Sequence, residues 1–236
     1  MNQRNENISS AQLRFEASHR RHHRIVTLLR LLLLITFLAV WELCADFKII
    51  DSFFFSSPSG VVRCLFTLWQ KNDLAVHIGI TLAETIASFL LVFLISLLCA
   101  TLLWYSTRLS EVLEPWLVVL NSLPKSALAP LLIVWLGTGM NTIIVAGISV
   151  AVFGAIINLY TGFRQVDEEK IRLIRTLGGN RRDSLFRVVL PASIPIILST
   201  MKVNIGLALV GVIIGEFLAA RRGLGYLIIY GSQVFR

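Results

Sequence analysis

The sequence predicts an all-α membrane protein, a polytopic helical bundle with five full spans. Of its 236 residues, 56% are apolar and only 15% are charged, and the mean hydropathy is +0.75. A typical soluble domain is about half apolar and carries roughly a quarter charged residues. The apolar residues are also gathered into runs of about 20, the length that an α-helix needs to cross a bilayer. Together these observations exclude an ordinary soluble domain.

Three windows have the composition of simple membrane spans. The windows 85–105 and 142–163 contain no charged residue. The window 25–45 carries Arg30 and Glu42 near its ends, where long side chains reach the membrane interface. This first window is longer than the apolar core of a secretory signal peptide and no small-residue cleavage site follows it, so we predict a span that is not cleaved.

Two further windows are apolar but interrupted. The window 115–136 contains Asn121, Pro124, Lys125 and Pro130, and the window 188–215 contains Pro191, Pro195, Lys202 and Asn204. Prolines and polar groups are costly inside the hydrocarbon unless they face protein or water. Two interpretations stay open: these helices are buried within the bundle, or they line a translocation path. Asn204 and Glu216 are the candidate path residues, with helix packing and an outer anchor as their alternative roles.

The distribution of basic residues predicts the orientation. With the N-terminus inside the cell, thirteen of the 22 Lys and Arg residues fall in inner segments and six in outer segments. Cytoplasmic segments of membrane proteins are enriched in these residues. We therefore expect a basic cytoplasmic tail at 1–24, flexible or an interfacial helix, ahead of a transmembrane domain at 25–236. The segment 46–76 is then an outer loop, and 164–187 is the main cytoplasmic loop.

The net charge of +8 does not indicate nucleic-acid binding, because the basic clusters flank apolar spans. The three cysteines and four histidines have no metal-ligand spacing, so no metal site or disulfide framework is expected. No phosphate-binding G-x-x-x-x-G-K-[ST] motif is present either. We therefore expect no catalytic residues, and a membrane-embedded enzyme remains a minor alternative.

The cytoplasmic loop is predicted to begin with a short helix. Asp167 is a suitable N-cap, and Glu168 and Glu169 place negative charge in the first turn, where it complements the helix dipole. Glu168 and Arg172 have the i,i+4 spacing of a helical ion pair. An apolar stripe runs along this helix through Ile171, Ile174 and Leu177.

A glycine turn and a second short helix are expected to follow. Gly178 and Gly179 supply a helix stop that tolerates positive φ. Asn180 and Asp183 have the spacing of a capping box, and Pro191 suits the first turn of the next span. The pattern alone is compatible both with a solvated loop and with a knob that docks on a cytoplasmic partner.

Several motifs resemble those of one transport family. Gly178, followed after nine residues by Val188-x-Leu190-Pro191, resembles the EAA loop of ABC importer permeases. Within that family the chain is similar to the nitrate/sulfonate/taurine-type permeases over roughly residues 35–236. The further matching blocks are Ser57-Pro58-Ser59, Leu123-Pro124, Ala129-Pro130-Leu131, Trp135 to Gly139, Gly215-Glu216 and Gly223-Leu224-Gly225.

The resemblance implies a type I (MetI-like) permease fold in a bacterial inner membrane, with ATP used by a partner ATPase and no cofactor in this chain. It also implies a second permease copy, most simply in a homodimer, and an external solute-binding protein that delivers the solute. A thiamine precursor or another vitamin is the alternative to a nitrate-, sulfonate- or taurine-like solute. By the same resemblance, the residues expected to dock on the ATPase are Glu168, Glu169, Arg172, Arg175, Thr176, Leu177, Gly178, Gly179, Asn180, Leu190 and Pro191.

Two departures from the family pattern affect these expectations. The E-A-A triplet falls on Arg172, Leu173 and Ile174, so its acidic residue is absent, and Glu168 and Glu169 one turn earlier are the candidates to replace it. The family fold normally has six spans, but only about 12 residues follow the G-L-G element, too few to cross a bilayer. The sequence is therefore expected to be a truncated form, a variant with an outer C-terminus, or a non-transporting interaction subunit.

Overall fold

The computed structural model describes residues 10–47, 49–50, 56–70 and 73–234, and these residues form helices and turns without any strand. The expected all-α class is therefore confirmed. The chain divides into two compact units, residues 1–71 and 72–236. Four of the helices are long and apolar enough to cross a membrane: Arg24–Asp46, Leu74–Tyr105, Met140–Arg164 and Ile194–Ala219.

The first unit consists of α1 (Ser10–Asp46) and α3 (Pro58–Gln70). The expected tail at 1–24 differs from the structure, because residues 10–24 belong to the same helix as the first span, and residues 1–9 lie outside the described residues. Glu42 joins the two helices by accepting hydrogen bonds from the Ser59 backbone N–H at 3.0 Å and from Ser59 Oγ at 2.6 Å. The segment expected as an outer loop thus contains a helix.

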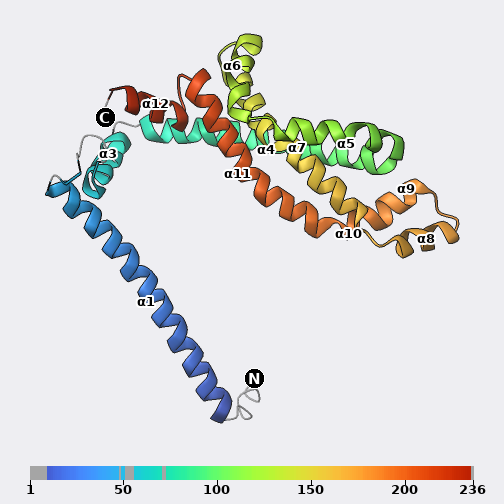
Figure 1. The fold of residues 1–236 in the computed structure, drawn as a ribbon, viewed down its shortest axis with the longest axis horizontal. Helices are drawn as coiled ribbons and strands as arrows, with labels where there is room; N and C mark the ends of the chain where they lie inside the picture. Colours follow the sequence, from blue (N-terminus) through green and yellow to red (C-terminus); the bar gives the residue numbers. More distant parts are fainter. Residues whose placement is uncertain (1–9, 48, 51–55, 71–72, 235–236) are drawn as a thin grey trace. The chain divides into compact units, whose positions relative to one another are not determined.

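The second unit contains the remaining helices (Figure 1). They are α4 (Asp73–Tyr105), α5 (Thr107–Ser122), α6 (Lys125–Leu136), α7 (Met140–Arg164), α8 (Glu168–Thr176), α9 (Arg181–Ser184), the π-helical turn η1 (Leu185–Val189), α10 (Leu190–Ala192), α11 (Ile194–Ala219) and α12 (Leu224–Val234). α7 lies at the centre and packs along α4 and α11, which also contact each other. These three helices form the frame that positions the rest.

Small residues set the distance between α7 and α11. Gly147 and Ala146 on α7 face Gly211 and Gly215 on α11, and a Cβ atom added to Gly211 would lie 2.8 Å from the Cα of Gly147. Membrane helices commonly use such residues, because close backbone approach increases van der Waals contact where no hydrophobic drive operates. The two helix backbones are therefore in near-direct contact.

The expected span over 115–136 is not one helix. α5 and α6 meet at an angle of 104°, so that the pair is either a broken span or a re-entrant loop. The number of spans reaches the expected five only if the two parts are counted together as one span. Pro124 explains the break, because a proline disfavours the helical conformation of the residue before it, and Leu123 is extended with ψ 139°. Lys125 Nζ donates hydrogen bonds to the carbonyl groups of Leu120 and Asn121 and so caps the end of α5.

Two other boundaries differ from expectation. The second span begins at Asp73 and not near Thr85, so α4 is about three turns longer than the charge-free window. The fifth span begins at Ile194, because the residues from 181 to 192 form α9, η1 and α10. Pro191 consequently lies in α10, and Pro195 occupies the first turn of the span itself.

Candidate functional site

The loop predicted to be cytoplasmic begins with the expected helix, α8. The Asp167 carboxylate accepts a hydrogen bond from the Glu169 N–H at 2.9 Å, as an N-cap does. Arg172 Nη2 lies 2.9 Å from Glu168 Oε2, in the expected i,i+4 ion pair. Both side chains are about three-quarters exposed, so this pair stabilises α8 by only a few tenths of a kcal/mol.

The glycine turn has the geometry of a Schellman motif. Gly178 has φ +85°, its N–H donates to the Arg175 carbonyl at 3.0 Å, and the Gly179 N–H donates to the Ile174 carbonyl at 2.9 Å. No atom lies within 4 Å of a Cβ placed on Gly178, so only the backbone conformation requires glycine there. At Gly179 the same Cβ would collide with Ile174. The two glycines are therefore needed for different reasons.

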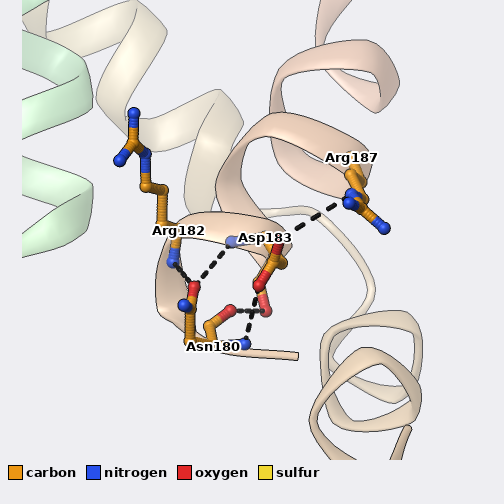
Figure 2. A network of polar contacts seen from close by, with 5 residues as sticks. Asn180, Arg182, Asp183 and Arg187 are labelled. Carbon is orange, nitrogen blue, oxygen red and sulfur yellow. Dashed lines mark hydrogen bonds and ion pairs between the residues drawn. The ribbon is translucent and has the colours of Figure 1, made fainter. Parts of the chain in front are cut away.

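Asn180 caps the second helix, as Figure 2 shows. Its Oδ1 accepts hydrogen bonds from the backbone N–H groups of Arg182 and Asp183, both at 3.0 Å, and Asp183 Oδ2 accepts from the Asn180 N–H at 3.0 Å. This reciprocal capping box confirms the predicted pairing of Asn180 with Asp183. Arg187 Nε lies 3.7 Å from Asp183 Oδ1 and extends the network along the helix.

The tip of the loop exposes apolar side chains. Leu177, directly before the turn, is 75% exposed, and Leu173 is 59% exposed. The predicted apolar stripe divides, because Ile174 is half-buried beneath Gly179 and Ile171 packs against the core cluster, whereas Leu177 faces outward. A rigid turn that presents leucines among arginines has the character of a protein-binding surface.

The other end of the loop is anchored in the bundle. Leu185 and Val189, on η1, are 3% and 0% exposed and belong to the core cluster formed with α4 and α7. Arg181 Nη2 donates to the Trp104 carbonyl at 3.0 Å and lies 3.3 Å from Thr107 Oγ1. The loop is thus connected by packed side chains to α7 and by the Arg181 hydrogen bonds to the α4–α5 junction.

A charged cleft of about 470 Å³ lies between α8, α5 and the end of α7. Its lining includes the basic residues Arg164, Arg172, Arg175 and Arg181 and the acidic residues Glu111, Glu114 and Glu168. Such a density of ionised groups requires contact with water, so this end of the second unit lies outside the hydrocarbon.

The two candidate path residues both lie on α11 and are both buried. Asn204 is 4% exposed, its Nδ2 donates to the Thr200 carbonyl at 2.7 Å, and its Oδ1 has no hydrogen-bond partner. The cavity beside it has about 10 Å³, room for at most one water molecule. No solute could pass through this cavity, which favours the packing interpretation of Asn204.

Glu216 also makes contacts within the bundle. It is 1% exposed, and its two carboxylate oxygens accept hydrogen bonds from Thr81 Oγ1 and from the Gly225 N–H, each at 2.6 Å. The Gly215-Glu216 and Gly223-Leu224-Gly225 elements, recognised separately in the sequence, are therefore one structural unit. These contacts favour the anchoring interpretation of Glu216 over a path-lining one.

The predicted site residues thus fall into separate places. The structure brings the residues from Glu168 to Asn180 together on the exposed tip, whereas Leu190 and Pro191 lie beyond η1 and Asn204 and Glu216 lie on α11. Sequence reasoning missed the anchoring role of Arg181 and its aromatic partners. An available signal was the pair Trp104–Tyr105 at the end of a long span, because Arg181 stacks on both rings at 5.7 and 5.8 Å.

Comparison with known proteins gives consistent matches. Residues 92–235 match the family described as binding-protein-dependent transport system inner membrane component. A probable ABC transporter permease protein of Haemophilus influenzae is 34% identical over 88% of this chain and 84% of its own length. The formylaminopyrimidine transport permease protein ThiX of Halalkalibacterium halodurans is 26% identical over 80% of this chain and 75% of its own. The putative aliphatic sulfonates transport permease protein SsuC of Bacillus subtilis is 28% identical over 86% and 74%.

Proposed function

The chain belongs to the inner-membrane components of binding-protein-dependent transport systems, the permease subunits of ABC importers, and we propose that its solute is an aliphatic sulfonate or a similar small anion. Permeases of this family are multi-pass membrane proteins and not enzymes. ATP is hydrolysed by a separate ATPase subunit, and a solute-binding protein delivers the solute.

The single observation that carries the coupling role is the rigid, exposed turn at Leu177–Gly178. Its leucine is three-quarters exposed, while the chain on its C-terminal side is anchored in the core through Leu185 and Val189. A docking surface needs exposed apolar side chains, and an element that transmits a movement needs to be anchored in the core. In this proposal the ATPase binds the tip of the loop. Closure of the ATPase on ATP then moves α4, α5 and α7. The loop and the N-terminus then lie in the cytoplasm of a bacterial cell.

The proposed path lies between two copies of the chain. The cavity beside Asn204 is too small for a solute, and the α11 side chain Lys202 is exposed, whereas Glu216 is buried. The exposed surface of α11 thus carries the Lys202 cation, while the Glu216 carboxyl group is buried inside the bundle, and this distribution suits a path for an anion. A second copy facing this surface would enclose the path, and a homodimer is the simplest arrangement.

The sulfonate assignment has a competitor in a pyrimidine. A relative named for formylaminopyrimidine transport is nearly as similar to this chain as one named for aliphatic sulfonates. A neutral or cationic pyrimidine would not be attracted electrostatically by the exposed Lys202 side chain. This residue is therefore the reason for preferring an anion as the solute.

Uptake by the reconstituted importer tests the proposal. The permease is placed in liposomes with the ATPase and binding protein encoded beside it, and uptake of an alkanesulfonate and of formylaminopyrimidine is measured. We expect ATP-dependent sulfonate uptake that falls at least several-fold in Lys202→Gln and is retained in Lys202→Arg. Uptake of the pyrimidine alone would contradict the assignment of the solute. Equal sulfonate uptake by both variants would contradict the role of Lys202.

A further inference from the structure

Two glutamates meet inside the bundle, away from the coupling loop. Glu84 on α4 is 3% exposed and Glu216 on α11 is 1% exposed. Thr81, one helical turn before Glu84 on the same face of α4, donates to Glu216 at 2.6 Å, so the two carboxyl groups are neighbours. The ion pairs recorded for the described residues, Arg172–Glu168 and Arg187–Asp183, both lie on the loop. Two adjacent carboxylates without a cation would be a very costly arrangement in a buried site, because neither charge is solvated and they repel each other.

The hydrogen bonds around Glu216 make it the acceptor of the pair. One of its oxygens accepts from Thr81 Oγ1 and the other from the Gly225 N–H, each at 2.6 Å. A backbone N–H can only donate, so the oxygen that faces Gly225 must act as an acceptor. Both Glu216 oxygens are thus already acceptors, which leaves the role of donor to Glu84.

Among the described residues, the nearby basic side chains form no ion pair with either glutamate. His77, two turns before Glu84 on α4, contacts the turn before α12 instead, with its Nδ1 2.8 Å from the Gly223 nitrogen and 3.1 Å from the Gly223 carbonyl oxygen. Tyr226 stacks on His77. Arg221 and Arg222 are exposed and make no recorded ion pair with either glutamate among the described residues.

Glu84 has the contacts of a neutral carboxyl group. One of its oxygens, Oε2, is buried without a hydrogen-bond partner. An orphaned carbonyl oxygen of a protonated acid costs much less than an orphaned oxygen of a carboxylate. A protonated Glu84 carboxyl group can donate a hydrogen to Glu216, as in other buried carboxyl pairs that share one proton.

We propose that Glu84 and Glu216 form a buried proton-binding site, in which protonated Glu84 donates a hydrogen bond to ionised Glu216. The proton is the ligand that allows three segments to meet at one point: α4 through Thr81 and Glu84, α11 through Glu216, and the turn before α12 through Gly225. That turn is bonded to α4 a second time, since the Leu224 N–H donates to Thr81 Oγ1 at 2.9 Å. The glycines of the turn fit this role, because a Cβ on Gly223 or Gly225 would overlap the Glu216 side chain.

Two isosteric variants of the full-length permease test the site. Gln in place of Glu84 still donates a hydrogen to Glu216, so Glu84→Gln is expected to keep the wild-type melting temperature in nanodiscs to within a few degrees. Gln in place of Glu216 keeps one acceptor oxygen but turns an N–H₂ group towards a donor, so Glu216→Gln is expected to melt well below the wild type. The infrared band of a protonated carboxyl group, present in the wild type, should be missing from Glu84→Gln.

The outcomes against the proposal are equally distinct. Equal destabilisation by both variants, or an unchanged carboxyl band in Glu84→Gln, would show that Glu84 does not hold the proton. A wild-type melting temperature that rises with added Na⁺, K⁺ or Ca²⁺, together with loss of that rise in Glu84→Gln, would replace the proton with a metal cation. None of these measurements requires a solute or an ATPase, so they are independent of the proposed function.

Discussion

Replacement of Gly211 by leucine is expected to prevent the second unit from folding. A Cβ at this position would lie 2.8 Å from the Gly147 Cα and 3.0 Å from the Ala146 carbonyl oxygen, both backbone atoms that cannot move without displacing α7. Overpacking against side chains typically costs about 1–3 kcal/mol, and a clash with backbone costs more because no rotamer change relieves it. We expect little monodisperse protein after detergent extraction, measured by size-exclusion chromatography and thermal melting.

Gly206 provides the matched control on the same helix. No atom lies within 4 Å of a Cβ placed on it, so Gly206→Leu adds the same side chain without an internal clash. The control should be extracted and should melt close to the wild type. If Gly211→Leu were as stable as Gly206→Leu, the close contact between α7 and α11 would be wrong.

Replacement of Gly178 by valine is expected to uncouple ATP hydrolysis from uptake. Gly178 has φ +85°, a conformation that costs an L-residue roughly 1–2 kcal/mol and a β-branched residue more, so the turn should open. The position is exposed and has open space around it, so the bundle itself should remain folded. In the reconstituted importer, uptake per ATP hydrolysed should fall at least tenfold with little change in melting temperature.

Asparagine is the control at the same position, because it tolerates the left-handed conformation better than other non-glycine residues. Gly178→Asn should retain most of the coupled uptake even though its side chain is larger than hydrogen. Uptake by Gly178→Val equal to that of the wild type would mean that the shape of this turn does not matter for coupling.

The loop was predictable from the sequence because its signals are local. Caps, the glycine stop and the i,i+4 ion pair act within a few residues, and the structure has them at Asp167, Gly178 and Asn180 as expected. The long apolar windows were equally clear, since crossing a bilayer imposes a length that few other structures need.

The beginning of α4 was missed for a physical reason. The charge-free window starts at Thr85 because Glu84 precedes it, and a carboxylate facing lipid would indeed end a span. In the structure Glu84 faces Glu216, 132 residues later, so the helix continues back to Asp73. No local pattern reveals that a partner so distant in sequence is present.

The bend at Leu123–Pro124 and the anchoring of Arg181 were missed in a similar way. The prolines of the third window were visible, but two of the three lie inside helices, Pro115 in α5 and Pro130 in α6, and only Pro124 falls at the break. At this break Lys125 caps the exposed carbonyl groups of α5, a contact that the proline pattern does not reveal. The anchoring of Arg181 depends on its hydrogen bond to the Trp104 carbonyl, which forms only when the folded chain brings α4 and the loop together.

The most direct test of the central claim is co-purification of the partner ATPase with the permease from membranes. The wild type is compared with a variant in which Leu173 and Leu177, both exposed on the tip, are replaced by aspartate, and with an Arg30→Gln variant as the control outside the loop. We predict that the ATPase is recovered with the wild type and the control and is lost from the leucine variant, while all three remain folded. Recovery of the ATPase with all three would contradict the assignment of the loop as the docking site.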